Sequence, residues 1–316
     1  MNAHLTDRLI LLGYNAGWSA VRHLPDRAAY AAFRKVADLV WWRQSPSVRR
    51  LELNLARALG TTDAATVREA SRQGMRSYLR YWCDAFRLPD WTRDRIVSRV
   101  HVVGEDNMRA PLAAGRGVIA ALPHMANWDH AGAWACLTGA PVTTVAERLQ
   151  PEELFERFLA FREGLGMEIV PLTGGTNDVF STLAARLREP RLVPLLADRD
   201  LSKRGVEVRF FGEATRMPAG PAALALRTGA ALLPTSLWYE GVEPEHRVVI
   251  RFHDEVEPPN AVRGADRVAA LTQAVADELA PAIAAHPQDW HMLQSLFLAD
   301  LTQDSDTPGV RADAGR

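Results

Sequence analysis

From about residue 100 onward, short apolar runs rich in β-branched residues alternate with longer stretches of helical periodicity. We expect strands near 117–122, 142–146, 168–172, 192–197, 206–211, 232–239 and 247–253. We expect helices near 127–138, 151–164, 177–188, 218–228, 265–285 and 288–299. Parallel strands need long crossover connections, which helices supply, so this alternation is typical of α/β folds. The sequence therefore predicts an α/β fold with a central mixed or mostly parallel sheet and helices on both faces.

The first hundred residues have a helical pattern throughout. Apolar residues recur at helical spacing within 33–41, 51–59 and 75–82, and prolines at 25, 46 and 89 punctuate this helical region. The last residues are polar and contain Gly, Pro and Asp, a composition typical of disorder. We therefore expect three parts: a helical, membrane-associating region over 1–98, an α/β core over 99–301 that forms one domain with it, and a disordered tail over 302–316.

Charge is distributed unevenly along the chain. Residues 1–80 hold 13 Lys or Arg and 6 Asp or Glu, whereas the whole chain has a net charge of -1. This basic front end indicates an anionic partner. Nucleic acid is disfavoured because no aromatic-basic or helix-turn-helix motif is found. Anionic lipid fits better, and no transmembrane helix is expected because no apolar run reaches 18 residues.

The N-terminal helices have two interpretations, which the sequence leaves open. In the first they form a cap over the sheet, and their tryptophans belong to the core. In the second they are an interfacial anchor, with Trp18, Trp41 and Trp42 at the depth of the lipid headgroups.

Several classes of protein are disfavoured because their motifs are missing from the sequence. With only Cys83 and Cys136, a disulfide framework is not expected, and a reducing cytoplasm fits. No Cys/His cluster has the spacing of a zinc site, so no metal is expected. No Gly-x-Ser-x-Gly elbow of a serine hydrolase occurs, nor a Gly-x-Gly-x-x-Gly loop after a strand or a P-loop.

One histidine follows an apolar strand directly. The strand over 118–122 ends at Pro123, His124 comes next, and Asn127 is suited to cap a following helix that carries Asp129 in its first turn. The carboxyl ends of strands are where open α/β sheets bind ligands. Imidazole, with a pKa of roughly 6.5, is suited to take a proton from a hydroxyl, and a carboxylate improves it by fixing its tautomer. Asp129, about one helical turn away, is a candidate for that carboxylate.

The chain resembles the bacterial lysophospholipid-type acyltransferases. Within them it is most similar to the actinobacterial phosphatidylinositol mannoside acyltransferases, and more distantly to the lipid A late acyltransferases. The resemblance runs from about residue 78 to 301 and rests on several blocks in order: 115–117, 124–132, 144–149, 161–166, 195–201, 210–221, 228–231 and 288–294.

The resemblance implies a reaction and its substrates. A long acyl group, typically palmitoyl, would pass from acyl-CoA to the 6-hydroxyl of the mannose at the 2-position of inositol in a phosphatidylinositol mannoside. Acyl-CoA is then a substrate, and no cofactor is expected. The acceptor lipid would lie on the cytoplasmic leaflet, so the resemblance implies a peripheral position on the anionic inner surface of the cell membrane, on its cytoplasmic face, in agreement with the basic front end.

The resemblance also assigns catalytic residues. His124 takes the role of general base, and the family's acidic residue falls on Asp198, at the end of another predicted strand. Glu is expected at that position in close relatives, so a shorter side chain stands here. We favour Asp198 as the partner of the imidazole and Asp129 as a supporting hydrogen-bond acceptor, although the sequence leaves open which of the two is the direct partner.

Further residues are candidates for binding the donor or acceptor. Arg162 suits CoA phosphates, because the arginine fork binds them well. Glu147, after another strand, is placed to bind acceptor hydroxyls or to orient Arg162. Arg199 would add positive charge, and Arg227 would face the site from the turn at 228–229. For each of the four the alternative is an ordinary solvated or packing role.

Two other functions stay open at this point. One is acyl transfer to another glycolipid or a lysophospholipid, or with an acyl carrier protein as donor. The other is a non-catalytic protein that binds acyl lipids. The motif around His124 does not choose among them.

Overall fold

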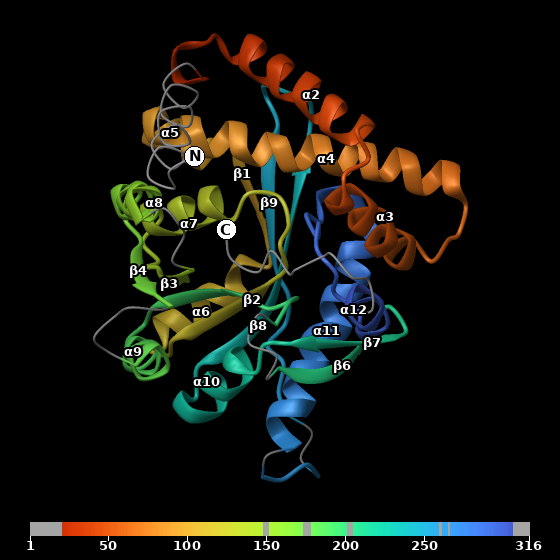
Figure 1. Cartoon of the computed structure of the whole chain (residues 1–316). Coiled ribbons are helices and arrows are strands. Elements are labelled where there is room, and N and C mark those ends of the chain that lie inside the picture. Colours follow the sequence, from red (N-terminus) through yellow and green to blue (C-terminus); the bar gives the residue numbers. More distant parts are fainter. Residues whose placement is uncertain are drawn as a thin grey trace.

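The computed structural model describes residues 21–147, 152–172, 178–200, 205–258, 261–264 and 266–305. A central sheet is flanked by helices on both faces, and the N-terminal helices lie across one end of it (Figure 1). The predicted α/β fold is confirmed.

The central sheet has five strands in the order β1-β9-β8-β2-β5. These are β1 (Val100–Val103), β9 (Arg247–Phe252), β8 (Ala231–Glu240), β2 (Val118–Leu122) and β5 (Leu192–Leu196). Strands β8, β2 and β5 are parallel neighbours, and β9 runs antiparallel to β8. Every residue of β2 is buried, as expected for a strand covered on both faces. The sheet is therefore mostly parallel, and β8 and β9 are the one antiparallel pair of neighbours among its described strands.

Two smaller sheets adjoin this one. Strands β3 (Thr143–Ala146) and β4 (Glu168–Pro171) are parallel, and a bridge between Val142 and Leu192 joins them to the edge strand β5. Strands β6 (Val206–Phe210) and β7 (Glu213–Met217) form an antiparallel hairpin. The β3–β4 pair thus extends the parallel part of the sheet beyond β5.

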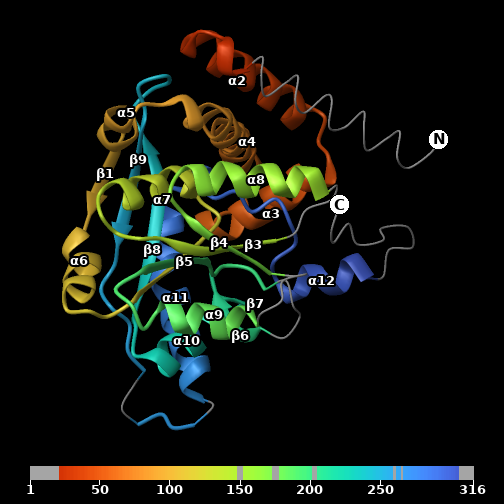
Figure 2. The same cartoon turned by 90° about the vertical axis from the view of Figure 1, so that its left-hand side faces the viewer.

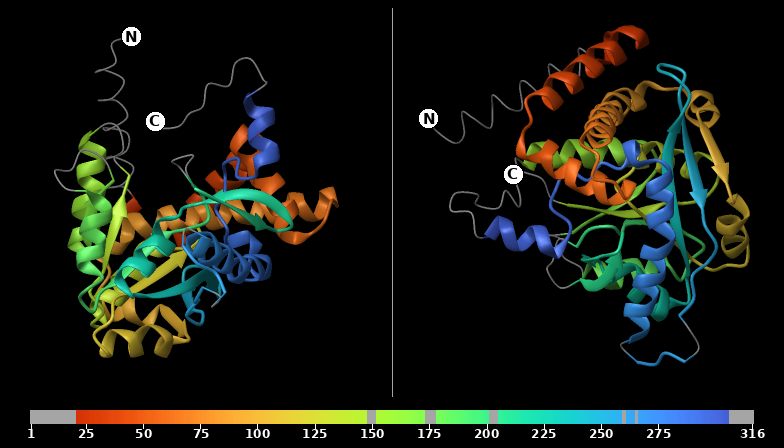
Figure 3. Two further views of the ribbon diagram at one scale, coloured as in Figure 1. Left: turned by 90° about the horizontal axis from the view of Figure 1, so that it is seen from below. Right: turned by 90° about the vertical axis from the view of Figure 1, so that its right-hand side faces the viewer.

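The connections decide which helices cover each face. Helix α6 (Glu105–Ala113) joins the antiparallel strands β1 and β2. Between parallel strands, the crossovers α7 (Trp128–Leu137) and α8 (Glu152–Gly164) step toward β4, whereas α9 (Val179–Arg186) and α10 (Gly220–Thr228) step back. Because such crossovers are right-handed, the two groups lie on opposite faces. Helix α11 (Asp266–Ala285) packs beside α10. Figures 2 and 3 show α11 and α6 on opposite sides of the strands.

Helices α2 (Asp26–Trp42), α3 (Pro46–Leu59) and α4 (Ala64–Arg87) precede the sheet, followed by η1 (Leu88–Asp90) and α5 (Arg93–Ser98). Ser45 and Asp63 cap α3 and α4 through their side chains. One buried apolar cluster contains Leu51, Leu55 and Met75 of these helices as well as the central strands. The N-terminal helices therefore share the core of the sheet.

Helix α11 is the one described helix that is long and apolar enough to cross a membrane by length and composition. Its buried residues include Leu271, Val275 and Leu279, and it packs against β8 and β6. Contact with the sheet accounts for its apolar character, so we treat α11 as a core helix.

The seven predicted strands all correspond to observed strands, but the predicted helix over 288–299 is wrong. A short turn η2 (Pro287–Asp289) is followed by non-helical chain, and helix α12 (Leu298–Ser305) begins ten residues late. Trp290 and Phe297 make antiparallel bridges to other parts of the chain, and these contacts override the local helical pattern. Helix α12 also runs past the predicted start of the tail at 302, and residues 306–316 lie outside the described part of the chain.

Candidate active site

His124 lies just beyond the carboxyl end of β2. Asn127 caps α7, since its Oδ1 accepts a hydrogen bond of 2.9 Å from the backbone N–H of His130. The chain between the strand and the helix is thereby fixed as a short turn. The side chain of His124 is 28% exposed, so its ring is reachable from outside.

Asp198 stands beside His124 because of strand register. Leu122 of β2 pairs with Leu196 of β5, so the residues two positions further on meet at the same sheet edge. Nδ1 of His124 lies 2.6 Å from Oδ1 of Asp198, and the backbone N–H of His124 donates to Oδ2 at 3.0 Å. The carboxylate of Asp198 is fully buried. The structure thus brings together His124 and Asp198, the predicted general base and its favoured acidic partner.

The charge state of this pair follows from its surroundings. Burial by itself raises the pKa of Asp198, but the neighbouring His124 and the hydrogen bonds that the carboxylate accepts outweigh burial, and the net pKa lies below its ordinary value. Asp198 is therefore ionised at neutral pH. Since a carboxylate only accepts hydrogen bonds, Nδ1 of His124 carries the proton and Nε2 has the free lone pair.

A segment from the far end of the chain completes the pair. The indole N–H of Trp290 donates to Oδ2 of Asp198 at 2.9 Å. The backbone N–H of His291 donates to the carbonyl of His124 at 2.7 Å. The backbone carbonyl of Asp289 accepts from the N–H of Ala126 at 3.0 Å. Ala126 has a φ of 45°, a left-handed conformation that is strained for a residue with a side chain. The turn that carries His124 is thus held in place by residues 289–291.

The polar side chains behind this segment are also paired. Ser77 of α4 donates to Asp289 at 2.6 Å and lies 2.9 Å from Nε2 of His291. Burial lowers the pKa of His291 to about 3, so this ring is neutral and donates from Nε2 to Ser77. Helix α4 is therefore tied to the back of the site.

Asp129 does not touch the imidazole, contrary to the expectation that one helical turn would bring it back to His124. Its carboxylate accepts from Tyr81 at 2.8 Å and from Nε of Arg162 at 2.7 Å. The first turn of α7 points Asp129 toward α4 and α8, where it is 2% exposed. The direct partner of His124 is Asp198.

Arg162 is therefore occupied by a buried ion pair. Its side chain is 18% exposed. Burial would lower the pKa of the guanidinium, but Asp129 raises the pKa above its ordinary value. A role in binding CoA phosphates stays a prediction, and any such contact would add to the bond with Asp129.

Glu147 and Arg199 end neighbouring strands on the same edge as the His124–Asp198 pair. Glu147 is exposed, and Arg199 directly follows Asp198. Burial lowers the pKa of Arg199, while the charges of Asp198 and Glu147 oppose that change. Glu147 and Arg199 thus lie within electrostatic reach of each other beside the pair.

Arg227 lies at the opposite edge of the sheet. It ends α10, which leads into the amino end of β8, whereas His124 follows the carboxyl end of the parallel strand β2. Its guanidinium stacks on Phe180 of α9, 5.3 Å from the ring centroid. The expectation that Arg227 faces the site is wrong, because a helix that precedes a strand ends at the edge remote from that strand's carboxyl end.

A negatively charged oxygen that forms beside His124 would need hydrogen-bond donors, but several backbone N–H groups of this turn are already used. The N–H of His124 donates to Asp198, that of Met125 to Pro123 at 2.7 Å, and that of Ala126 to Asp289. Asn127 and Trp128, at the start of α7, carry the remaining candidate donors of the turn.

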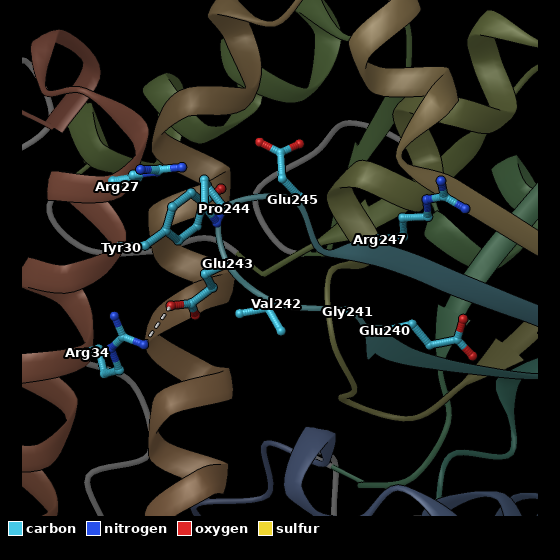
Figure 4. Close-up of a pocket in the computed structure, with 10 residues that line it drawn as sticks. All are labelled: Arg27, Tyr30, Arg34, Glu240, Gly241, Val242, Glu243, Pro244, Glu245 and Arg247. Carbon is cyan, nitrogen blue, oxygen red and sulfur yellow. Dashed lines mark ion pairs between the residues drawn. The ribbon is translucent and has the colours of Figure 1, made fainter.

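Cavities elsewhere in the molecule are distinct from this site. One of about 790 Å³ lies between α2 and the β8–β9 hairpin and is lined by arginines and glutamates, among them Arg34 and Glu243 (Figure 4). Another of about 580 Å³ lies between β9 and α11. Neither of these two is lined by His124 or Asp198.

Sequence reasoning missed Trp290 and Tyr81 as parts of the site. The block over 288–294 is one of the marks of the resemblance, but its local pattern predicts a helix. A buried tryptophan and a buried tyrosine have no sequence pattern that separates a hydrogen-bonding role from core packing.

Comparison with known proteins agrees with this geometry. A sequence profile described as bacterial lipid A biosynthesis acyltransferase matches residues 3–299. The chain is 45% identical over 293 residues to a phosphatidylinositol mannoside acyltransferase of Mycolicibacterium smegmatis, covering 93% of each protein. It is 47% identical over 292 residues to a protein of the same name from Mycobacterium tuberculosis, covering 92% of this chain and 89% of that one. The chain therefore belongs to the bacterial lipid A biosynthesis acyltransferase family and is an acyltransferase.

Proposed function

We propose that the protein transfers a long-chain acyl group, with palmitoyl-CoA as donor, to the 6-hydroxyl of the mannose at the 2-position of inositol in a phosphatidylinositol mannoside. The acceptor class is suggested by the names of the relatives that match almost the whole chain. The observation that carries the chemistry is the 2.6 Å contact between His124 and the buried Asp198.

The pair can perform acyl transfer without a covalent enzyme intermediate. Nε2 of His124 takes the proton of the acceptor hydroxyl while its oxygen attacks the thioester carbonyl. Asp198 stabilises the imidazolium that forms. The tetrahedral intermediate then collapses: the C–S bond breaks, the new ester C–O bond stays, and the imidazolium returns its proton to the CoA sulfur.

The surrounding charges suit the two substrates. Arg199, next to Asp198, offers a cation for a CoA phosphate or for the inositol phosphate. Glu147 is exposed on the same edge and offers an acceptor for sugar hydroxyls. Arg162, already bonded to Asp129, would serve mainly to hold α8 against α7 beside the site.

The test of this proposal is the product itself. Purified protein is incubated with palmitoyl-CoA and a panel of acceptors: phosphatidylinositol mannosides, phosphatidylinositol and a lysophospholipid. Tandem mass spectrometry should locate one new palmitoyl ester on the mannose at the 2-position of inositol. Esterification of a different acceptor, or transfer only from acyl carrier protein, would replace the substrates proposed here. Tight binding of palmitoyl-CoA without product or hydrolysis would support the non-catalytic alternative.

A membrane-facing surface on α2 is part of the proposal, with the protein peripheral on the cytoplasmic face of the cell membrane. Val36, Leu39 and Trp42 recur at helical spacing and are 48%, 47% and 72% exposed. Trp41 differs, because its indole donates to Ser71 at 2.8 Å and packs toward α4. Trp18, the remaining tryptophan of the predicted anchor, lies outside the described residues.

We expect the V36S/L39S/W42S variant to bind vesicles of phosphatidylinositol and phosphatidylcholine at least roughly tenfold more weakly than wild type, since it removes the apolar face that would enter the interface. Co-sedimentation measures this binding. The matched control is L172S, which changes a 40% exposed leucine after β4. Equal binding by wild type and the triple variant would rule out α2 as the contact surface.

A further inference from the structure

Trp290 is the largest fully buried side chain of the described residues, and it is in contact with the pair at the active site. We propose that Trp290 is a positioning residue, whose indole N–H holds Oδ2 of Asp198 so that Oδ1 is directed at His124. This role rests on the proposed function of the pair and extends it to a residue far along the chain.

The bonds to Asp198 divide its two oxygens. Oδ2 accepts from the indole of Trp290 at 2.9 Å and from the backbone N–H of His124 at 3.0 Å. Oδ1 lies 2.6 Å from the imidazole. With two donors fixed on Oδ2, rotation of the carboxylate about its last bond would break both bonds. The ring of His124 is thereby bound by the one oxygen that remains.

The backbone around Trp290 makes this arrangement rigid. Met125, next to His124, forms an antiparallel bridge with Trp290, and both neighbours of Trp290 are bonded to the same turn. Asp289 is itself anchored, because it accepts from Ser77 and from the backbone N–H of Tyr239 at 3.0 Å. The segment 289–291 therefore holds the turn of His124 through its backbone, and it holds Asp198 through the indole of Trp290.

The indole bond has a consequence that packing alone would not produce. It stabilises the carboxylate, so it favours the state of the pair in which the imidazole is neutral and the acid is ionised. Without the indole donor, the pair should take up a proton at higher pH, whichever of its atoms receives that proton. If Trp290 only filled space, its replacement would not change the pH at which the His124–Asp198 pair takes up a proton.

The experiment compares W290F with W91F. Trp91 is a matched control: it is 8% exposed, and its indole N–H has no hydrogen-bond partner within the part of the chain that the structure describes. Titration of the His124 ring is followed by NMR on protein with labelled histidine, alongside the pH dependence of kcat/KM. For W290F we expect the protonation midpoint of His124 and the acid limb of kcat/KM to rise together by about one pH unit. For W91F neither should move.

Failure of this inference is separable from failure of the proposed function. The NMR titration needs no substrate, so it tests Trp290 even if the acceptor is misassigned. If W290F does not fold, Trp290 is replaced by 3-benzothienylalanine, which keeps the two fused rings and exchanges the N–H for sulfur. An unchanged titration of His124 in the folded variant would overturn the positioning role, whereas the expected rise with no acyl transfer in wild type would retain that role and reject the reaction.

Discussion

Replacing His124 with alanine should lower kcat/KM for acyl transfer by roughly 1,000-fold, because the acceptor hydroxyl then has no base to take its proton. His124 is the ring whose Nε2 has a free lone pair beside a buried carboxylate. The side chain is 28% exposed, so its removal should leave the protein folded. Initial rates with palmitoyl-CoA and a phosphatidylinositol mannoside measure the loss, and thermal unfolding checks the fold.

The control for this variant is H101A. His101 lies on the edge strand β1 and is 55% exposed, and its Nδ1 lies 3.8 Å from a carboxylate oxygen of Glu240. It loses the same side chain as H124A and should keep wild-type rates. Near-normal transfer by H124A would mean that another group, or the substrate itself, removes the proton.

The D198N variant should be impaired by roughly 100- to 10,000-fold, because it places the imidazole in the wrong tautomer. The indole of Trp290 and the backbone N–H of His124 both donate to the same oxygen of Asp198. An amide would turn its oxygen toward these two donors and its NH₂ toward Nδ1 of the ring. Nδ1 would then accept, the proton would move to Nε2, and the base would lose its free lone pair.

D84N is the matched control for D198N. Asp84 is also fully buried, and it accepts from Tyr30 at 2.5 Å and lies 3.0 Å from a histidine nitrogen, that of His246. Both variants should lose some stability. Only D198N should also lose turnover per folded molecule, because only this variant changes the tautomer of His124. If D84N and D198N lost activity equally after correction for the folded fraction, Asp198 would have no special role.

The pH dependence of kcat/KM for wild type distinguishes protonation of His124 from protonation of Asp198. The pKa of Asp198 is lowered in the folded protein, so its ionised form contributes stability above its ordinary pKa of about 4. That contribution is lost only as the pH falls through the lower, folded value. The acid limb of kcat/KM, if it lies above pH 4, therefore reports protonation of the imidazole.

The sequence alone predicted seven of the described strands but missed β1 and β7, and the resemblance favoured Asp198 as the partner of His124 without deciding it. The run 118–122 is apolar because a parallel strand in the middle of a sheet is buried on both faces, and the run 192–196 is largely buried as well. His124 and Asp198 each follow such a strand by the same number of residues, so their meeting is a consequence of register. The cap at Asn127 is a local property of the residues that follow it, and it too was predicted.

Tertiary structure decided everything that depends on contacts between distant parts of the chain. Local pattern assigned residues 288–299 to a helix, but Trp290 bonds to Asp198, 92 positions earlier, and the helix does not form. Asp129 was expected near His124 on spacing, yet Tyr81 and Arg162 bind it from two other helices. Periodicity reports which side of an element is buried, because burial repeats with the element's own geometry. It does not report which partner lies across the interface, since that is fixed only when the elements pack together.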